Sequence, residues 1–204
     1  MLLVPGLCLW LVTGYIGKTH LVHAIELFHA NHKGEIAMQL NVTRHPYSFI
    51  GDQNGGDGSG GGLAGSDAPL TQTWHDGLLG YMNNDENARD NAERGMYAQG
   101  VQAGIKFDYH VLAQWQPVES QRMLLWAGRF GLQEEFMSAL NKRHFEQRQS
   151  ASERTTLLAA AEEVGLDTVK AAAFLATKEL EDVVWESYGK TIRQKRIHSI
   201  PLVR

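Results

Sequence analysis

The chain has 204 residues, a formal net charge of −4 at pH 7 and 43% hydrophobic residues, which suits one folded domain with or without a large insertion. The slight acidity argues against a surface for nucleic acid or for an anionic membrane, because both need clustered Lys and Arg. A single cysteine excludes a disulfide framework and suits a reducing compartment, so we expect a cytoplasmic protein.

Residues 1–12 are uncharged and mostly apolar. No basic residue precedes this run and no small-residue cleavage site follows it, so a buried first strand or a strand-to-helix turn fits better than a signal peptide. Apolar residues recurring on one face then predict a helix over 19–32. Alternation of apolar and polar residues predicts a strand over 35–42.

Residues 51–69 include eight glycines. Such a segment buries too little apolar area to offset its ordering entropy, so we predict a flexible surface loop. It contains a G-x-G-x-x-G match at Gly56, Gly58 and Gly61. No strand leads into this match and no helix follows it directly, so a nucleotide-binding turn is not indicated.

After the glycine-rich segment the sequence predicts a series of helices, interrupted over 100–104. Their expected caps or first residues are Asp85, Pro117, Gln133, Ser152, Asp167 and Thr177. The helix that follows Pro117 is expected to bury an apolar side that extends to Phe130. A final strand is predicted over 197–204, and the order of the elements indicates an α/β fold.

Histidines occur in two H-x-x-H pairs, His20 with His23 and His29 with His32. A spacing of three can place two imidazoles on one metal ion, but no third ligand accompanies either pair. We therefore predict solvated helix positions and no metal site. A surface turn is expected over 74–76, whose Trp-His-Asp sequence has no nucleophile beside it.

Thiol chemistry is indicated by Cys8-Leu9-Trp10, which precedes Tyr15-Ile16-Gly17-Lys18. A dithiol oxidoreductase needs a C-x-x-C pair at the start of a helix, and one cysteine cannot close that disulfide. Cys8 near a helix N-terminus would have a lowered pKa, because the helix dipole stabilises its thiolate. Alternatively, Cys8 is a small buried hydrophobe among apolar neighbours.

A set of motifs, in the right order, resembles the DsbA-like thioredoxin family, and in particular its FrnE-type branch, which opens with C-P-W-C-Y-I-G-K. The matching segments are 15–18, 44–49, 104–107, 119–127, 165–167 and 198–201. The resemblance implies an α/β, thioredoxin-like fold with a large α-helical insertion and with the C-terminal strands and helix truncated. It assigns 1–50 and 190–204 to the thioredoxin-like part, 51–70 to a flexible loop and 71–189 to a mainly helical insertion domain.

The resemblance also implies roles for particular residues. Pro201 would be the family's cis-proline, packed opposite the active-site helix, and the backbone of Ile200 would pair with an extended substrate. Trp10 would be a further substrate-binding residue.

The opening motif can be aligned in two ways. Without a gap, C-P-W-C falls on residues 11–14 and both thiols are absent. If Cys8-Leu9-Trp10 takes the place of C-P-W, Cys8 is the attacking cysteine and Leu11 replaces the resolving one.

Three functions follow from this resemblance. The first is thiol/disulfide chemistry on a thiol or disulfide substrate, with Cys8 acting as a monothiol and no resident cofactor. The second is a glutathione-dependent isomerase or transferase acting on a small molecule, in which the hydroxyl of Thr13 or Tyr15 polarises the glutathione sulfur. The third is a non-catalytic binding protein. The truncated end would leave an open sheet edge, which a homodimer could cover.

Overall fold

The computed structural model describes residues 9–32, 44–47, 70, 72–114 and 117–193. Its helices are α1 Leu9–Asn31, α2 Trp74–Tyr81, α3 Glu86–Gln102, α4 Val118–Gly128, α5 Gln133–Gln147, α6 Arg154–Glu163, α7 Thr168–Leu175 and α8 Glu181–Arg193. The strands predicted over 35–42 and 197–204 lie outside the described residues, as does the glycine-rich segment 51–69.

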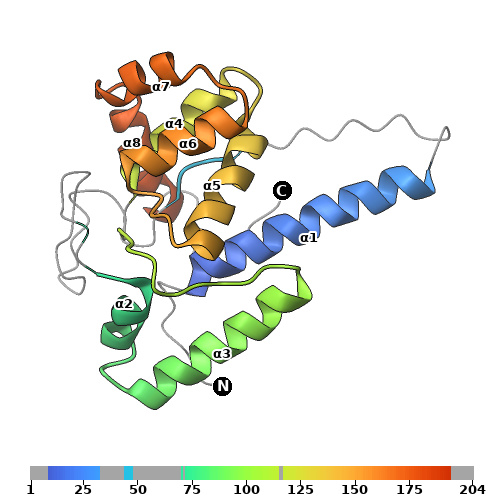
Figure 1. The fold of residues 1–204 in the computed structure, drawn as a ribbon, viewed down its shortest axis with the longest axis vertical. Coiled ribbons are helices and arrows are strands. Elements are labelled where there is room, and N and C mark those ends of the chain that lie inside the picture. The colour runs from blue at the N-terminus through green and yellow to red at the C-terminus, as the bar shows by residue number, and fades with distance from the viewer. Residues whose placement is uncertain (1–8, 33–43, 48–69, 71, 115–116, 194–204) are drawn as a thin grey trace.

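Helices α4 to α8 form a bundle at one end of the molecule (Figure 1). Within it, α4 packs against α5, α7 and α8, while α6 contacts α5 and α7. The bundle buries one apolar cluster, whose fully or nearly fully buried members include Met123, Trp126, Ala127, Phe136, Leu157, Ala160 and Phe174. Burial of this surface is the main source of the bundle's stability.

A second apolar cluster joins α1, α2 and α3 to the segment that follows α3. Its members include Val12, Ile16, Trp74, Leu78, Met96, Ile105, Phe107, Tyr109, Val111 and Phe145. Phe145 comes from α5, so α5 contributes to both clusters and forms the wall between them. Figure 1 shows α1 beginning near the end of α5 and running outward alongside α3.

Helix α1 begins ten residues before the predicted helix over 19–32. The expected first strand or strand-to-helix turn is therefore wrong for residues 9–12, which are helical. Residues 7–13 contain no Gly or Pro, and Val12 and Ile16, one helical turn apart, are both buried. Burial of that pair favours helix over strand here.

Helix α2 occupies the position of the predicted surface turn, so that prediction is also wrong. A capping box starts the helix: Thr73 Oγ1 accepts from the Asp76 amide at 3.1 Å, and the Thr73 amide donates to Asp76 Oδ2 at 3.4 Å. Trp74 and Leu78 then bury their side chains in the second cluster. The box is a local signal that the sequence analysis missed.

Helix α3 begins at Glu86, one residue after the predicted start, and Asp85 caps it by accepting a hydrogen bond from the Ala88 amide. The predicted break over 100–104 is wrong for its first residues, because α3 continues to Gln102. Gly100 is buried in the helix, where it leaves room for the ring of Phe107. The chain turns only at Gly104, where φ is +79°.

In the bundle, Asp167 caps α7 as predicted, accepting from the amides of Val169 and Lys170. Phe130 was expected to be buried but is 51% exposed, because α4 ends at Gly128. Ser152 does not cap α6, whose first flanking residue is Glu153.

Thr177 was expected to cap α8, and this too is wrong. Its hydroxyl instead donates to the carbonyl of Phe174 at 2.7 Å, at the end of α7. Leu180, with φ at +67°, then turns the chain immediately before α8 begins. No helix among the described residues is long and apolar enough to cross a membrane.

The bundle encloses a charged side chain, Arg122, which is 1% exposed. Its Nε donates to the carbonyl of Glu179 at 2.7 Å and its Nη2 to that of Thr177 at 2.6 Å. Its Nη1 donates to both carboxylate oxygens of Glu119, at 2.7 and 2.8 Å. The guanidinium also lies 5.0 Å from the ring centre of Phe174, so it ties α4 to the turn between α7 and α8.

We expect Arg122→Met to lower the free energy of unfolding by about 3–5 kcal/mol, because it leaves a partly buried carboxylate and several carbonyls without their donor. Arg129→Met is the matched control. Arg129 contacts Glu179 as well, but in an exposed ion pair, so its loss should cost less than about 1 kcal/mol. Urea unfolding followed by circular dichroism measures both free energies of unfolding. Equal losses of free energy in the two variants would contradict the role given to the buried contacts of Arg122.

Two glycines of α3 provide a second prediction. A Cβ at Gly100 would lie 2.4 Å from Cε2 of Phe107, whereas one at Gly95 would have no neighbour within 4 Å. Gly100→Ala should therefore destabilise the protein by about 1–3 kcal/mol through overpacking. Gly95→Ala should stabilise it by about 0.5–1 kcal/mol through helix propensity. If the melting temperatures of Gly100→Ala and Gly95→Ala shift in the same direction, the packing of Phe107 on Gly100 is described incorrectly.

Candidate functional site

The predicted site residues fall into two groups. Thr13 and Tyr15 lie within α1, and Trp10 belongs to the first turn of the same helix. Cys8, Ile200 and Pro201 lie outside the described residues. The structure therefore shows how α1 is held, and the first described residue of α1 is Leu9.

Tyr15 points from α1 to the C-terminal part of α5. Its hydroxyl donates to Glu146 Oε1 at 2.8 Å. The ring stacks on Phe145, with 5.6 Å between centroids, and meets Phe107 edge-on at 6.1 Å. Burial, and then the hydrogen bond to Glu146, raise the pKa of the Tyr15 hydroxyl well above its usual range. The phenol is thus held as a neutral donor to a carboxylate of the helical body.

Lys18 makes the second polar contact between α1 and α5. Its side chain is 6% exposed, and Nζ donates to Ser138 Oγ at 2.6 Å and lies 3.8 Å from Glu134 Oε2. Burial lowers the pKa of the Lys18 ammonium, while the charge of Glu134 opposes that shift. Ser138 Oγ itself donates to the carbonyl of Glu134 at 2.7 Å. The serine hydrogen is therefore engaged by the backbone, and the pair joins two helices rather than forming a serine nucleophile with its base.

Glu134 also holds the segment 44–47. Arg44 donates to both carboxylate oxygens of Glu134 through Nε and Nη2. The Arg44 amide donates to Gln133 Oε1 at 2.9 Å, and on the other side Ser187 of α8 donates to the carbonyl of Pro46 at 2.8 Å. One carboxylate at the start of α5 thus fastens both α1 and the segment 44–47 to the bundle.

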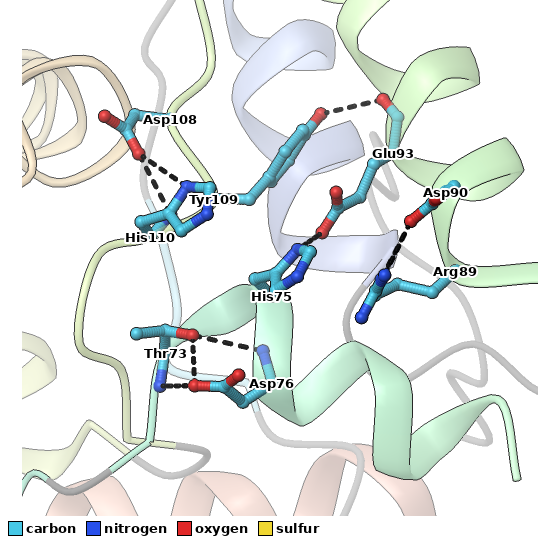
Figure 2. A network of polar contacts seen from close by, with 9 residues as sticks. All are labelled: Thr73, His75, Asp76, Arg89, Asp90, Glu93, Asp108, Tyr109 and His110. Carbon is cyan, nitrogen blue, oxygen red and sulfur yellow. Dashed lines mark hydrogen bonds and ion pairs between the residues drawn. The ribbon is translucent and has the colours of Figure 1, made fainter. Parts of the chain in front are cut away.

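A separate polar network surrounds His75 in α2 (Figure 2). His75 Nδ1 lies 2.9 Å from Glu93 Oε1 of α3, and the His75 ring stacks on that of His110, with 5.0 Å between centroids. The His110 amide donates to Asp108 Oδ1 at 2.9 Å, and Arg148 at the end of α5 donates to Asp108 Oδ2. The network joins α2, α3 and α5 to the segment after α3.

The stacked histidines are poorly arranged for a metal ion. Their planes are inclined by 19°, and a metal lies in the plane of each imidazole that binds it, so nearly parallel rings cannot share one ion without rotating. Among the described residues no group of three or more His, Cys, Asp or Glu is placed to hold a metal ion. His20, His23 and His29 are exposed on α1, as predicted. We therefore interpret the network around His75 as structural.

Sequence reasoning missed this network because its members are distant in the chain. Glu93 and His110 follow His75 by 18 and 35 positions, and no motif links them. Only the capping box at Thr73 could have placed His75 on a helix in advance. The contacts of Tyr15 and Lys18 with α5 were equally invisible, since they join residues more than a hundred positions apart.

A family model described as a DSBA-like thioredoxin domain matches residues 85–195 of the chain. The matched segment extends from the cap of α3 to the end of α8. It includes Glu134, Ser138 and Glu146, the α5 residues that hold α1. It does not include Cys8 or Pro201.

Among solved structures, the crystal structure of a probable DsbA oxidoreductase from Streptomyces coelicolor is similar, with a TM-score of 0.71 and 17% sequence identity. The match covers 92% of this chain and 73% of the other. At this level of identity the similarity concerns the fold. No match was found among curated proteins.

The buried His144 of α5 generates a prediction on pH. Burial lowers its pKa from 6.5 to about 4, and its Nδ1 accepts from the Ala151 amide at 3.1 Å. In the unfolded chain the His144 imidazole is protonated below pH 6.5, whereas in the folded protein it stays neutral down to about pH 4. The free energy of unfolding should therefore decrease as the pH falls from 6.5 to about 4. In His144→Asn, which keeps an acceptor near Nδ1, this part of the fall should disappear.

Urea midpoints between pH 7 and pH 4 measure the effect. His23→Asn is the control, since His23 is exposed on α1. Identical pH profiles for wild type and His144→Asn would show that His144 is not the group responsible.

Proposed function

Because the chain belongs to the DSBA-like thioredoxin domain family, we propose that it acts in thiol/disulfide chemistry and that Cys8 is its reacting group. The fold expected from the sequence, a DsbA-like thioredoxin fold with a large helical part, is confirmed by the family match and by the structural neighbour. The FrnE-type branch and the role of Cys8 belong to the proposal, and they rest on the sequence motifs and on α1.

The observation that supports the proposal is that the residues following Cys8 in the sequence, from Leu9 onward, are helical. A reactive thiolate is stabilised at a helix N-terminus, where free amides and the helix dipole face it. Residues 11–14, which take C-P-W-C in the alignment without a gap, lie inside the helix instead. This supports the other alignment, in which Cys8 is the attacking cysteine and Leu11 stands where the resolving cysteine would be.

The reaction has two exchange steps. The Cys8 thiolate attacks one sulfur of a substrate disulfide, forms a mixed disulfide and releases the other sulfur as a thiolate. Because the chain has no second cysteine, an external thiol must attack the mixed disulfide and regenerate Cys8. We propose glutathione as that co-substrate, since it is the thiol that sets the redox poise of a reducing compartment.

The remaining site residues keep the roles that the family resemblance implies. Trp10 and the Ile200–Pro201 pair are proposed to contact the substrate beside the thiol. Thr13 is proposed to lie near the reacting sulfur as a hydroxyl group. These assignments propose that a disulfide-bearing substrate binds beside Trp10 and the Ile200–Pro201 pair, and not on the helical bundle.

The proposal predicts an activated thiol. Alkylation of native Cys8 by iodoacetamide should show an apparent pKa below the value found in denaturant, because only the folded chain places a helix after the cysteine. A native value equal to or above the denatured one would identify Cys8 as a buried structural residue and contradict the proposal.

Activity separates the proposal from its alternatives. Cys8→Ser should abolish the glutathione-dependent reduction of a peptide–glutathione mixed disulfide, whereas Thr13→Val should leave most of it. The reverse pattern, together with a rise in melting temperature at millimolar glutathione, would favour the glutathione-dependent isomerase or transferase. No turnover by either route in the wild type would favour a binding protein.

A further inference from the structure

Helix α8 packs on the bundle through a small apolar cluster of its own. Val184 and Tyr188 of α8 are buried together with Val118, the first residue of α4, and Leu125 and Trp185 pack at the edge of this group. The larger cluster that α4 to α7 share includes none of these five residues. Among the described helices α8 contacts mainly α4, so moving α8 away from α4 would leave the larger cluster in place.

Two hydrogen-bonding groups of α8 are buried without a partner among the described residues. They are the hydroxyl of Tyr188, which is 0% exposed, and the indole Nε1 of Trp185. The two residues are three positions apart, so they lie on one face of α8, and their rings meet edge-on with 5.6 Å between centroids. A buried donor without an acceptor costs free energy, because it has given up its hydrogen bonds to water. Both donors would regain these bonds if α8 moved away from α4.

The residue before α8 has a strained backbone. Leu180 has a φ of +67°, in the left-handed region, where the Cβ of an L-residue crowds the carbonyl oxygen that follows it. Glycine adopts this conformation without the penalty, whereas leucine does not. Leu180 also packs against the larger apolar cluster, and such packing is what allows a strained conformation to persist.

The chain on the N-terminal side of Leu180 is firmly anchored to α4. Arg122 donates to the carbonyls of Thr177 and Glu179, which lie just before Leu180. Helix α8 begins at Glu181, directly after it. A change of φ and ψ at Leu180 would therefore rotate α8 while the preceding turn stays bound to α4. Hinges are residues of this kind, which lie at the end of an element and absorb a change of backbone conformation.

Movement of α8 would also act on the segment 44–47. Ser187 of α8 donates to the carbonyl of Pro46 at 2.8 Å. The other end of the segment is held by α5, because Arg44 donates to Glu134. The position of α8 therefore decides whether the bundle holds this segment at two ends or at one.

We propose that α8 is a hinged helix, which opens from α4 about Leu180 before the rest of the bundle unfolds and thereby releases the Pro46 end of the segment 44–47. Opening relieves the strain at the hinge and returns two donors to water. It costs mainly the burial of Val184 and Tyr188. The inference concerns the helical bundle and does not depend on the function proposed above.

Native-state hydrogen exchange on the full chain tests the opening. The amides of residues 185–190 should share one opening free energy and be at least about tenfold less protected than those in the middle of α5, a difference of about 1.4 kcal/mol. Protection in α8 equal to that in α5 would show that α8 leaves α4 only when the whole bundle unfolds, and would contradict the hinge.

Tyr188→Phe tests the contribution of the unpaired hydroxyl. Its removal should favour the closed helix and slow exchange over 185–190 about threefold to tenfold. Tyr15→Phe is the matched control, because the Tyr15 hydroxyl donates to Glu146 at 2.8 Å, and its loss should slow exchange nowhere. Unchanged or faster exchange of α8 in Tyr188→Phe would show that the hydroxyl is satisfied in the closed state, against the inference.

Two substitutions at Leu180 test the hinge. Leu180→Gly and Leu180→Ala both remove the apolar contacts of the side chain, but only glycine is free of strain at positive φ. Exchange over 185–190 should therefore be about fivefold slower in Leu180→Gly than in Leu180→Ala. Equal exchange in the two variants would show that closure of α8 does not strain Leu180, and the hinge would be wrong.

The amide of Arg44, which donates to α5, reports on the segment 44–47. Ser187→Ala removes the bond to Pro46, so exchange of the Arg44 amide should rise. In Tyr188→Phe, which favours the closed helix, the same amide should exchange more slowly than in the wild type. A rate that is the same in all three proteins would show that α8 does not control the segment.

Discussion

The arrangement of the helical bundle depends on one buried cation. Arg122 reaches from α4 to three backbone carbonyls at the end of α7 and in the turn before α8, the longest of these contacts being 3.5 Å, and it is neutralised by Glu119 on its own helix. A guanidinium is costly to bury unless its donors are all engaged. The carbonyls at the end of α7 have the same requirement, because a helix leaves its last carbonyls without internal partners. Arg122 therefore supplies donors to carbonyls that lack helical partners, and these carbonyls in turn pair the donors of the buried guanidinium.

That interaction joins α4 to the turn that precedes α8, and α8 and α5 together hold the segment 44–47. Ser187 of α8 contacts Pro46 on one side, while α5 presents Glu134 on the other, so the segment 44–47 lies between two helices of the bundle. Helix α1 is attached to the same carboxylate, because Lys18 Nζ lies 3.8 Å from Glu134 Oε2. The place where we expect thiol chemistry is thus supported by a scaffold that the chain completes more than a hundred residues later.

Local sequence signals predicted the structure reliably where a side chain's partner was a nearby amide. Asp85 and Asp167 each cap a helix by accepting from amides within three residues of their own position, and the cap at Asp167 was anticipated from the local sequence. Thr177 also carries a side-chain oxygen that can cap a helix, yet its hydroxyl donates to Phe174, and Leu180 adopts a left-handed conformation between it and the start of α8. Phe130 has the correct spacing for the core of α4 but follows the end of that helix. In both cases the prediction was wrong because the position at which a helix begins or ends depends on tertiary packing.

By itself the sequence determined that one cysteine allows no internal disulfide, that the second half is helical, and that its ordered motifs resemble the DsbA-like family. The first two features follow from composition, from periodicity and from contacts within about four residues, whereas the resemblance rests on the order of the motifs. Only the tertiary structure decided the partners of Tyr15 and Lys18, which lie 131 and 120 positions away, and the stacking of His75 on His110. Such contacts form after helices with apolar faces have packed, and packing is set by the shape of the whole core and not by any one segment.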